Sequence, residues 1–304
     1  MGSYSFRCLD FHHFTLPALT GAQESVAMKP YRIVSINTLV LVIGLAALGG
    51  CASVHGNIPR AGSIVSASDH EPPVNLKEIS QQIERADYRH DSETLIRLQA
   101  SLEQDLEHTP RPGKYLYYYL GYVNYALADV LYEHTDKAER YVAASEDMLK
   151  HALKIDPDFA EAEALLGSSY GVEISLSPLK GMYLGFIASS ASARALRLDP
   201  DNPRAVLLKA ESDYQTPALF GGDKKLATAE FKKSLMLFDV YKAADADAPD
   251  WGKAEAYFWL AYAQAHTGDV QQARINYQAA LAIEPNYLDA KKALAKLEPK
   301  DAAK

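Results

Sequence analysis

Apolar residues recur at intervals of three and four positions along nearly the whole chain from residue 74 onward. This spacing is typical of α-helices that bury one face. No stretch shows the sustained alternation of apolar and polar residues that marks a half-buried β-strand. Prolines at positions 157, 200 and 285 interrupt the helical pattern, because proline cannot continue a helix. The pattern therefore predicts an all-α protein.

The short sequences that end at these prolines resemble one another and recur along the chain. Residues 152–157, 195–200 and 280–285 each contain Ala-Leu, one variable residue, Leu or Ile, an acidic residue and Pro. Between residues 251 and 287, alanines at 261, 273 and 280 would let two antiparallel helices approach closely, and Gly268 permits a left-handed turn between them. This unit resembles a tetratricopeptide repeat (TPR), whose period is about 34 residues.

The resemblance implies a TPR-type solenoid of antiparallel helical hairpins over residues 74–299. The spacing of Gly, Ala and Pro predicts about five hairpins. A lysine-rich helix from Leu288 to Leu297 would cap them, and residues 300–304 would form a disordered tail. A generic helical bundle is the alternative.

The N-terminal part of the chain has the features of a lipoprotein signal. The apolar run Leu39 to Leu48 is too short to span a membrane and suits the apolar core of a signal peptide. It follows a short basic stretch that begins at Met28, and it is followed by Gly49-Gly50-Cys51. This arrangement resembles a bacterial lipobox, which implies cleavage before Cys51 and attachment of lipid to its thiol. A cleavable signal with an incidental cysteine, or a buried segment, is the alternative.

These features predict a division of the N-terminal part. We expect residues 1–27 to be a mis-assigned upstream segment, 28–50 a signal peptide, and 51–73 the lipidated cysteine with a flexible tether. By resemblance to enterobacterial lipoproteins, Ala52 favours the periplasmic face of the outer membrane over the inner membrane. The expected location is therefore the bacterial cell envelope.

Composition narrows the choice of partners. The chain has 304 residues, two cysteines and a formal net charge of −8. Two cysteines are too few for a disulfide scaffold. The acidic balance argues against nucleic acid as a partner, since phosphate binding needs clustered Lys and Arg.

In TPR proteins, one side of each first helix lines a concave groove. Counting positions from Lys114 places Tyr115, Tyr118, Tyr122 and Tyr125 on that face, at spacings of three, four and three. Tyrosine suits a binding surface because it combines a large apolar face with a polar tip. An aromatic stripe is equally consistent with a helical core, and the sequence leaves this choice open. The same count adds Glu161, Ser168, Arg204, Leu207, Glu211, Tyr214, Phe258, Tyr262 and His266 to the groove.

Signals for catalysis are weak. Gly167-Ser168-Ser169-Tyr170-Gly171 matches the G-x-S-x-G pattern of serine hydrolases, which requires a strand-to-helix turn. Here the motif lies inside an expected repeat helix. The nine histidines lack metal-binding spacing. We therefore expect no enzyme activity, no cofactor and no metal.

Two functions fit these patterns. The first is a lipid-anchored TPR scaffold that binds a protein or peptide partner on its concave groove. For the second, the Pro-x-x-x-Gly-Gly-Asp loop from Pro217 to Asp223 is similar to a loop of the T-component associated with TRAP transporters. That likeness implies an accessory lipoprotein that binds or passes a small ligand, with segments 171–187 and 216–222 enclosing a pocket or pore. An open groove would favour the first function, and a closed channel lined by the tyrosines would favour the second.

Overall fold

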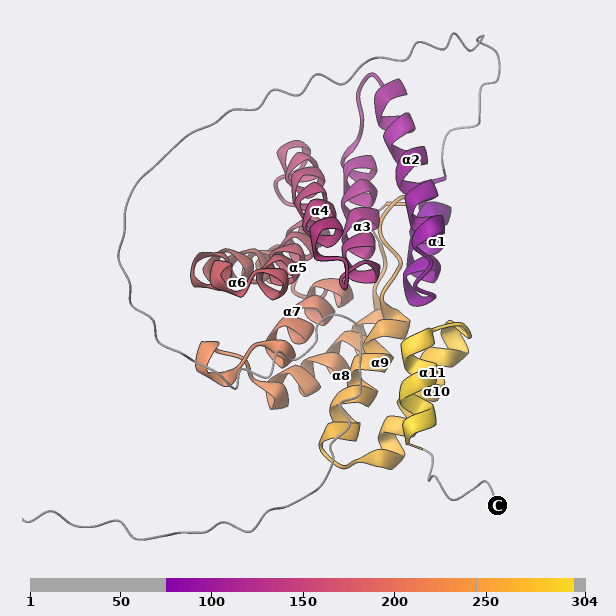
Figure 1. Ribbon diagram of the computed structural model, residues 1–304, viewed down its shortest axis with the longest axis vertical. Coiled ribbons are helices and arrows are strands. Elements are labelled where there is room, and N and C mark those ends of the chain that lie inside the picture. The colour runs from indigo at the N-terminus through magenta and orange to yellow at the C-terminus, as the bar shows by residue number, and fades with distance from the viewer. Residues whose placement is uncertain (1–74, 244, 298–304) are drawn as a thin grey trace, which may run out of the picture.

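The computed structural model describes residues 75–243 and 245–297 (Figure 1). Eleven α-helices and two short 3-10 helices, η1 (Pro178–Lys180) and η2 (Ala218–Phe220), account for the regular structure of these residues, which contain no β-strand. The first three hairpins are α1 (Leu76–Tyr88) with α2 (Ser92–His108), α3 (Lys114–Val130) with α4 (Thr135–Ile155), and α5 (Ala160–Leu176) with α6 (Gly181–Leu198). The remaining elements are α7 (Pro203–Gln215) with α8 (Lys224–Val240), α9 (Lys253–His266) with α10 (Val270–Ile283), and the single helix α11 (Leu288–Lys296).

The predicted all-α architecture of stacked hairpins with a capping helix is confirmed. Several expectations concern residues that the structure does not describe. They are the start at Met28, the signal peptide, the lipid on Cys51, the tether and the 300–304 tail. Within the described residues, none of the helices has the combination of length and apolar character needed to cross a membrane.

Several of the helices begin at a residue whose side chain caps them. Asp91, Asn202 and Asp223 each accept hydrogen bonds from backbone N–H groups in the first turn of α2, α7 and α8. These N–H groups have no partner within the helix, so the caps satisfy them. Local sequence therefore fixes where these helices begin.

Small residues allow the two helices of each hairpin to pack closely. A Cβ atom added at Gly121 would lie 2.6 Å from Cγ of Leu149, and one added at Gly167 would lie 2.8 Å from Oγ of Ser192. Both separations are too short for a side chain, so only glycine fits. The first glycine of the hydrolase-like motif, Gly167, is thus explained by the packing of α5 against α6.

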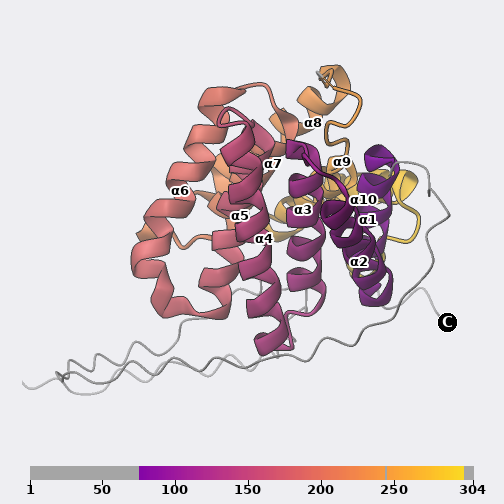
Figure 2. The same ribbon diagram turned by 90° about the horizontal axis from the view of Figure 1, so that it is seen from above.

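The stack closes on itself. The rings of Tyr88 at the end of α1 and Tyr287 at the start of α11 stack with centroids 4.1 Å apart. Beside them, Nε2 of His90 lies 2.9 Å from Oδ2 of Asp289. Figure 1 shows α11 next to α1, and the view from above places α6 at the opposite edge (Figure 2). The hairpins therefore form a ring rather than an open solenoid.

Candidate ligand-binding pocket

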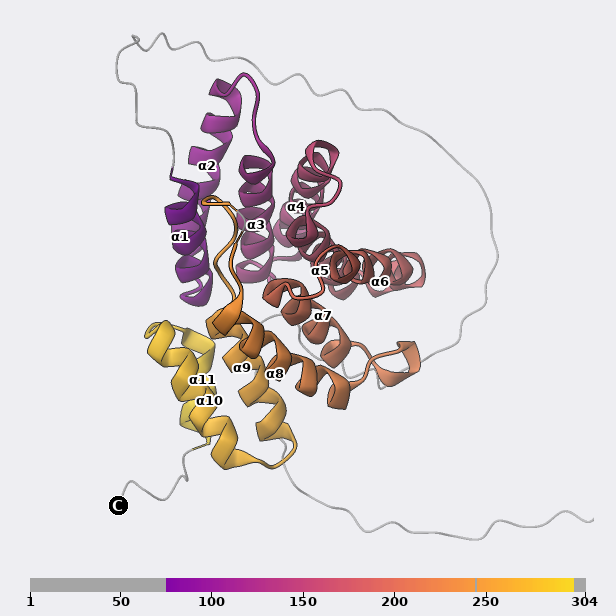
Figure 3. The ribbon, with the colours of Figure 1, turned by 180° about the vertical axis from the view of Figure 1, so that it is seen from behind.

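The connection between α8 and α9 occupies the concave side of the ring. This α8–α9 segment (residues 241–243 and 245–252) passes between α1 and α3 (Figure 3). Trp251 is 2% exposed, and its Nε1 donates a hydrogen bond of 3.0 Å to the hydroxyl of Tyr118. Its ring stacks on Tyr122 with centroids 4.6 Å apart. The face predicted as an open groove is therefore filled, over much of its length, by the chain itself.

Hydrogen bonds to helices far away in the sequence hold the segment in place. Asp250 accepts bonds from Ser80 at 3.0 Å and from Gln81 at 3.1 Å, both on α1. The hydroxyl of Tyr119 on α3 donates to the backbone carbonyl of Asp247 at 2.8 Å. The segment has no regular structure of its own, so these contacts with α1 and α3 define its path.

A glycine and a buried carboxyl group join the end of the segment to α1. Gly252 has a φ of +105°, a conformation that strongly favours glycine. Its N–H donates to Oε1 of Glu84 at 2.8 Å, and the hydroxyl of Tyr88 donates to the same oxygen at 3.0 Å. Burial raises the pKa of Glu84 to about 7, although these two hydrogen bonds act in the opposite direction. This contact therefore changes charge near neutral pH.

Two polar residues of the predicted groove pair with each other inside the ring. Arg204 is 2% exposed, and its Nη2 lies 3.2 Å from Oε1 of Glu161. The guanidinium group of Arg204 also lies 5.4 Å from the ring centroid of Tyr241. Both charges are thus engaged by neighbouring parts of the chain, and neither faces an open groove.

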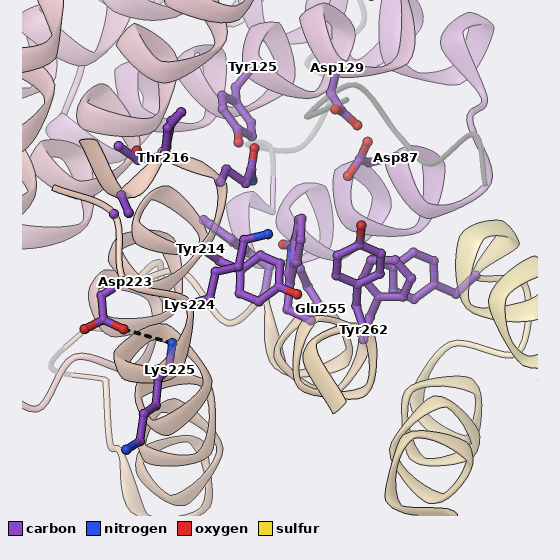
Figure 4. A pocket seen from close by; sticks show the side chains of 18 of the residues that line it. Asp87, Tyr125, Asp129, Tyr214, Thr216, Asp223, Lys224, Lys225, Glu255 and Tyr262 are labelled. Carbon is purple, nitrogen blue, oxygen red and sulfur yellow. Dashed lines mark hydrogen bonds between the residues drawn. The ribbon is translucent and has the colours of Figure 1, made fainter. Parts of the chain in front are cut away.

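The part of the concave side that remains open is a pocket of about 720 Å³ (Figure 4). Aromatic side chains from α3, α7, α9, the α8–α9 segment and the start of α11 form its walls, and both tryptophans of the chain are among them. These aromatic residues are Tyr122, Tyr125, Tyr214, Trp251, Phe258, Trp259, Tyr262 and Tyr287.

The loop between α7 and α8 covers one side of the pocket. Thr216, Pro217, Ala218 and Gly222 line the cavity. A Cβ atom added at Gly222 would lie only 1.8 Å from the carbonyl oxygen of Thr216, so the loop closes on itself at a glycine. Part of segment 216–222 therefore lines this pocket.

The other segment expected to enclose a pocket does not line this one. Residues 171–187 form the end of α5, η1 and the start of α6, and none of them lines this cavity. Leu179, Met182 and Phe186 are 86%, 82% and 82% exposed. The extra residues lengthen a hairpin and place its apolar side chains on the outside of the ring.

Carboxylates from three helices also line the pocket. They are Asp87 on α1, Asp129 on α3 and Glu255 on α9. Figure 4 shows the carboxylates of Asp87 and Asp129 pointing toward one another. The lining also includes Lys224 and Lys225, both exposed residues in the first turn of α8.

A further carboxyl group is buried next to this wall. Glu211 on α7 is 3% exposed, and its Oε1 has no hydrogen-bond partner. Burial raises the pKa of Glu211 well above its ordinary value, and the negative charges of Glu255, Asp129 and Asp87 raise it further. Burial and the neighbouring acidic groups thus favour the protonated form of Glu211.

The predicted groove residues divide into two groups. Tyr122, Tyr125, Tyr214, Phe258 and Tyr262 line the pocket. The others do not line it: Tyr118 and Leu207 are fully buried in the core, Tyr115 donates a hydrogen bond to Asp245, Glu161 pairs with Arg204, Glu211 is buried, Ser168 is partly buried and His266 is exposed. The stripe of tyrosines on α3 is thus partly core and partly pocket wall.

Sequence reasoning missed several lining residues. Asp87, Trp251, Glu255 and Trp259 lie outside the positions that the repeat frame assigns to the groove. For Trp251 a local signal was present, since a tryptophan between Asp250 and Gly252 interrupts an otherwise polar loop. For Asp87 the sequence offers no signal, because its place in the pocket depends on closure of the ring.

The hydrolase-like motif lies within α5, where Oγ of Ser169 donates a hydrogen bond of 3.0 Å to the carbonyl of Leu165. This serine is fully buried, so it is not available as a nucleophile. In the part of the chain that the structure describes, no group of three His, Cys, Asp or Glu side chains is arranged to hold a metal ion.

Comparison with known proteins supports the fold. No family model and no curated protein matches the chain. Among solved structures, it is similar to the HusA haemophore from Porphyromonas gingivalis, at 25% identity over 64% of this chain and 95% of HusA, with a TM-score of 0.53. It is also similar to TTC0263, a thermophilic TPR protein of Thermus thermophilus, at 19% identity over 72% of this chain and 98% of that one, with a TM-score of 0.46. The chain has the fold of TPR-type helical-repeat proteins.

Proposed function

We propose that this helical-repeat scaffold binds a small molecule with a flat apolar part in the pocket of the ring. The observation that carries this proposal is the closure of the concave side into an aromatic pocket by the α8–α9 segment and by the contact of α1 with α11. A peptide partner of a TPR protein would need a long open groove, and the chain itself occupies that place.

The size and lining of the pocket agree with a small ligand. Its volume of about 720 Å³ lies within the range of small-molecule sites, which runs from about 300 to 1,000 Å³. Its walls are mostly aromatic, and a few polar side chains stand among them. Aromatic walls favour a ligand whose own rings stack on them.

The similarity to HusA adds support. HusA is a haemophore, and 95% of its chain aligns with this one. HusA thus has a similar helical fold and is named for haem, a flat small molecule. We take from this comparison the class of ligand, a planar molecule of moderate size, and not its identity.

We further propose that the protein acts at a membrane surface in the bacterial envelope, on the periplasmic face of the outer membrane. The apolar run before Cys51 and the small residues next to it support this location. Lipid on Cys51 would tether the ring through residues 52–73, as in the T-component type of accessory lipoprotein. Metabolic labelling with a fatty acid tests this, since Cys51→Ala should abolish the label.

Fluorescence offers a direct test of ligand binding, because both tryptophans line the pocket. We would titrate the full-length protein in detergent with the neutral planar dye Nile red. Saturable one-to-one quenching of tryptophan emission, with a blue shift of the dye, is the expected result. Absence of saturable binding would overturn the proposal.

Two tyrosines of α3 provide a matched pair of variants. Tyr125 is partly buried and lines the pocket, whereas Tyr117 is partly buried and stacks on His151 outside it. Tyr125→Ala should weaken Nile red binding about tenfold, which corresponds to about 1.4 kcal/mol. Tyr117→Ala should leave Nile red binding unchanged. If both variants lose affinity for Nile red equally, the dye does not bind in this pocket.

A second candidate function is the binding of a protein partner on the outer surface. The exposed side chains of Leu179, Met182 and Phe186 favour it, since large apolar side chains grouped on one surface mark interaction sites. The partner would present an apolar surface to η1 and the first half of α6. A photo-crosslinking residue at position 186 in intact cells should capture one protein, and Met182→Glu should abolish the crosslink. A crosslink that persists in this variant would contradict the assignment.

A further inference from the structure

We propose that the outer face of α8, together with the loop before it, lies against a bilayer that contains anionic phospholipid. We call this face the α8 surface, and it consists of Leu219, Phe220, Lys225, Lys232, Met236 and Val240. The inference rests on the proposed membrane location and names the part of the ring that meets the lipid. It follows from protruding apolar side chains, from lysines without ion pairs and from the place of the pocket mouth.

The loop before α8 carries two apolar side chains that protrude from the protein. In η2, Leu219 is 88% exposed and Phe220 is 71% exposed. Side chains exposed to this extent make few contacts with their own chain, so a rigid partner would need a matching cavity for each of them. The fluid boundary between lipid headgroups and acyl chains adapts to such shapes. Burial there removes apolar area from water, which favours the contact.

The exposed side of α8 continues this apolar character along the helix. Met236 and Val240 are exposed, and they follow Lys225 and Lys232 on the same helix. The spacings of seven, four and four positions place these four side chains on one face, because they are close to whole helical turns. The opposite face, which includes the buried Phe231, packs against α7 and α9. The outer face thus combines large apolar side chains with basic ones, as helices at membrane surfaces do.

The positive charge of this face is not offset by ion pairs. Within the part of the chain that the structure describes, neither Lys225 nor Lys232 forms an ion pair, and Figure 4 shows the ammonium group of Lys225 extended away from the pocket. The acidic residues of α8 and its cap are engaged otherwise: Asp223 caps the helix, Glu230 is partly buried and Asp239 pairs with a lysine of α9 at 2.7 Å. Because lysines are attracted to anionic headgroups, the charge favours an anionic bilayer over a neutral one.

The apolar patch on η1 and α6 differs in this respect. Within it, Lys180 pairs with Glu173 at 2.6 Å, and further along α6 Arg194 pairs with Glu163 at 2.8 Å. Its basic side chains are therefore already neutralised by carboxylates of α5. That patch suits the apolar surface of a protein partner, whereas the α8 surface joins apolar side chains to free positive charge.

The α8 surface adjoins the mouth of the pocket. Pro217, Ala218 and Lys224 line the cavity and are also exposed, so the cavity reaches the surface of the protein beside η2. Leu219 and Phe220 come directly after Pro217 and Ala218 in the chain. Contact of η2 with lipid therefore places the mouth at the bilayer, where an apolar planar ligand is concentrated because it partitions out of water.

A fluorescent amino acid reports which face of the protein meets the lipid. We would incorporate dansylalanine at position 220 of the full-length protein, or at position 186 as the control, since both positions hold exposed phenylalanines on outer surfaces. Each protein would be reconstituted on phosphatidylcholine vesicles that contain phosphatidylglycerol. At position 220 we expect a blue shift of the emission and quenching by lipids that carry a nitroxide on the acyl chain. At position 186 we expect neither.

The outcomes separate this inference from the proposals on which it rests. Protein that floats with the vesicles but shows no quenching at position 220, or equal quenching at position 186, would overturn the inference alone. A blue shift at position 220 without nitroxide quenching would also overturn it, because a second copy of the chain or another protein would then cover the α8 surface. Failure to float with vesicles would overturn the membrane location as well. Nile red binding tests the small-molecule function independently of all these results.

Charge variants test the role of the anionic lipid. At the phosphatidylglycerol content that gives half-maximal quenching at position 220, Lys232→Glu should lower the ratio of docked to undocked protein about tenfold or more. Lys154→Glu, at an exposed position in the last turn of α4, makes the same change in net charge and should leave this ratio unchanged. Circular dichroism should show the parent helical content in both variants. No loss in Lys232→Glu, or an equal loss in Lys154→Glu, would overturn the inference.

Discussion

The α9–α10 hairpin and the α8–α9 segment are neighbours in the chain, and each carries one of the two tryptophans. In the hairpin, close packing rests on Ala261, Ala273 and Ala280, which are completely buried and lie within twenty positions of one another. In the segment, Trp251 is held by Tyr118, a residue 133 positions away. One region is stabilised by local contacts, and the other by contacts across the ring.

The difference explains how a repeat fold acquires a site. Hairpins of this kind are stabilised mainly by their own helices and their immediate neighbours, so they stack without needing a distant partner. The α8–α9 segment needs α1 and α3 already in place, and its ordering costs entropy that only those contacts can offset. The pocket uses walls from both regions, so its shape depends on ring closure.

The two tryptophans should differ in their contribution to stability. Trp251→Ala removes a fully buried ring and its hydrogen bond to Tyr118, and it should lower the free energy of unfolding by about 3–5 kcal/mol. Trp259→Ala removes a partly buried ring on α9 and should cost about 1–2 kcal/mol. Urea unfolding followed by circular dichroism measures both. Equal losses in the free energy of unfolding for the two variants would show that the α8–α9 segment depends on Trp251 no more than the α9–α10 hairpin depends on Trp259.

Two glycines with positive φ make a second pair. Gly252 ends the segment at a φ of +105°, and Gly268 forms the turn of the hairpin at +86°. An added Cβ meets nothing within 4 Å at Gly268, but at Gly252 it would lie 3.2 Å from Cζ of Phe238 and 3.3 Å from Cδ2 of Leu207. Gly268→Ala should therefore cost about 1 kcal/mol of conformational strain, and Gly252→Ala about 2–3 kcal/mol.

Thermal unfolding of both glycine variants measures this difference. The helical content of each should remain that of the parent protein at low temperature, because neither glycine lies inside a helix. A larger loss for Gly268→Ala would contradict the idea that the segment is the more tightly constrained region.

A further prediction depends on pH. Because the pKa of Glu84 is about 7 in the folded protein and near 4.5 in the unfolded chain, the folded state binds this proton more tightly. Glu84 therefore lowers stability progressively as pH rises from about 4.5 to 7, by at most about 3 kcal/mol above that range. Glutamine does not titrate, and its oxygen can still accept the hydrogen bonds from Gly252 and Tyr88.

Glu84→Gln should thus be nearly neutral below about pH 4.5 and increasingly stabilising up to about pH 7. Urea unfolding of both proteins across this range gives the difference directly. As a control, Glu103→Gln on exposed α2 should show no such trend. A constant difference between Glu84→Gln and the parent protein would mean that this carboxyl group titrates normally in the fold.

The hairpins were predictable because their determinants lie close together in the sequence. Helical spacing, the caps at Asp91, Asn202 and Asp223, and the small residues at Gly121 and Gly167 each act within one hairpin or between adjacent helices. Such signals can be identified without knowledge of the whole fold.

The tyrosine stripe of α3 marks the limit of this reasoning. Spacing placed Tyr118, Tyr122 and Tyr125 on one face of a helix, and the structure leaves them on the same side of α3. Whether each became core or pocket wall depended on Trp251, which comes from a loop more than 120 positions later. Helical periodicity identifies the face of a helix but not what covers it.

The sequence by itself determined the all-α repeat, the five hairpins and the capping helix, because these arise from local propensity and from the packing of adjacent helices. Only the tertiary structure decided that the stack closes, that the α8–α9 segment fills its concave side, and that Asp87, Asp129 and Glu255 meet around one aromatic pocket. The physical reason is distance along the chain. Contacts between residues more than 100 positions apart depend on the summed geometry of every hairpin between them, and no short stretch of sequence encodes that sum.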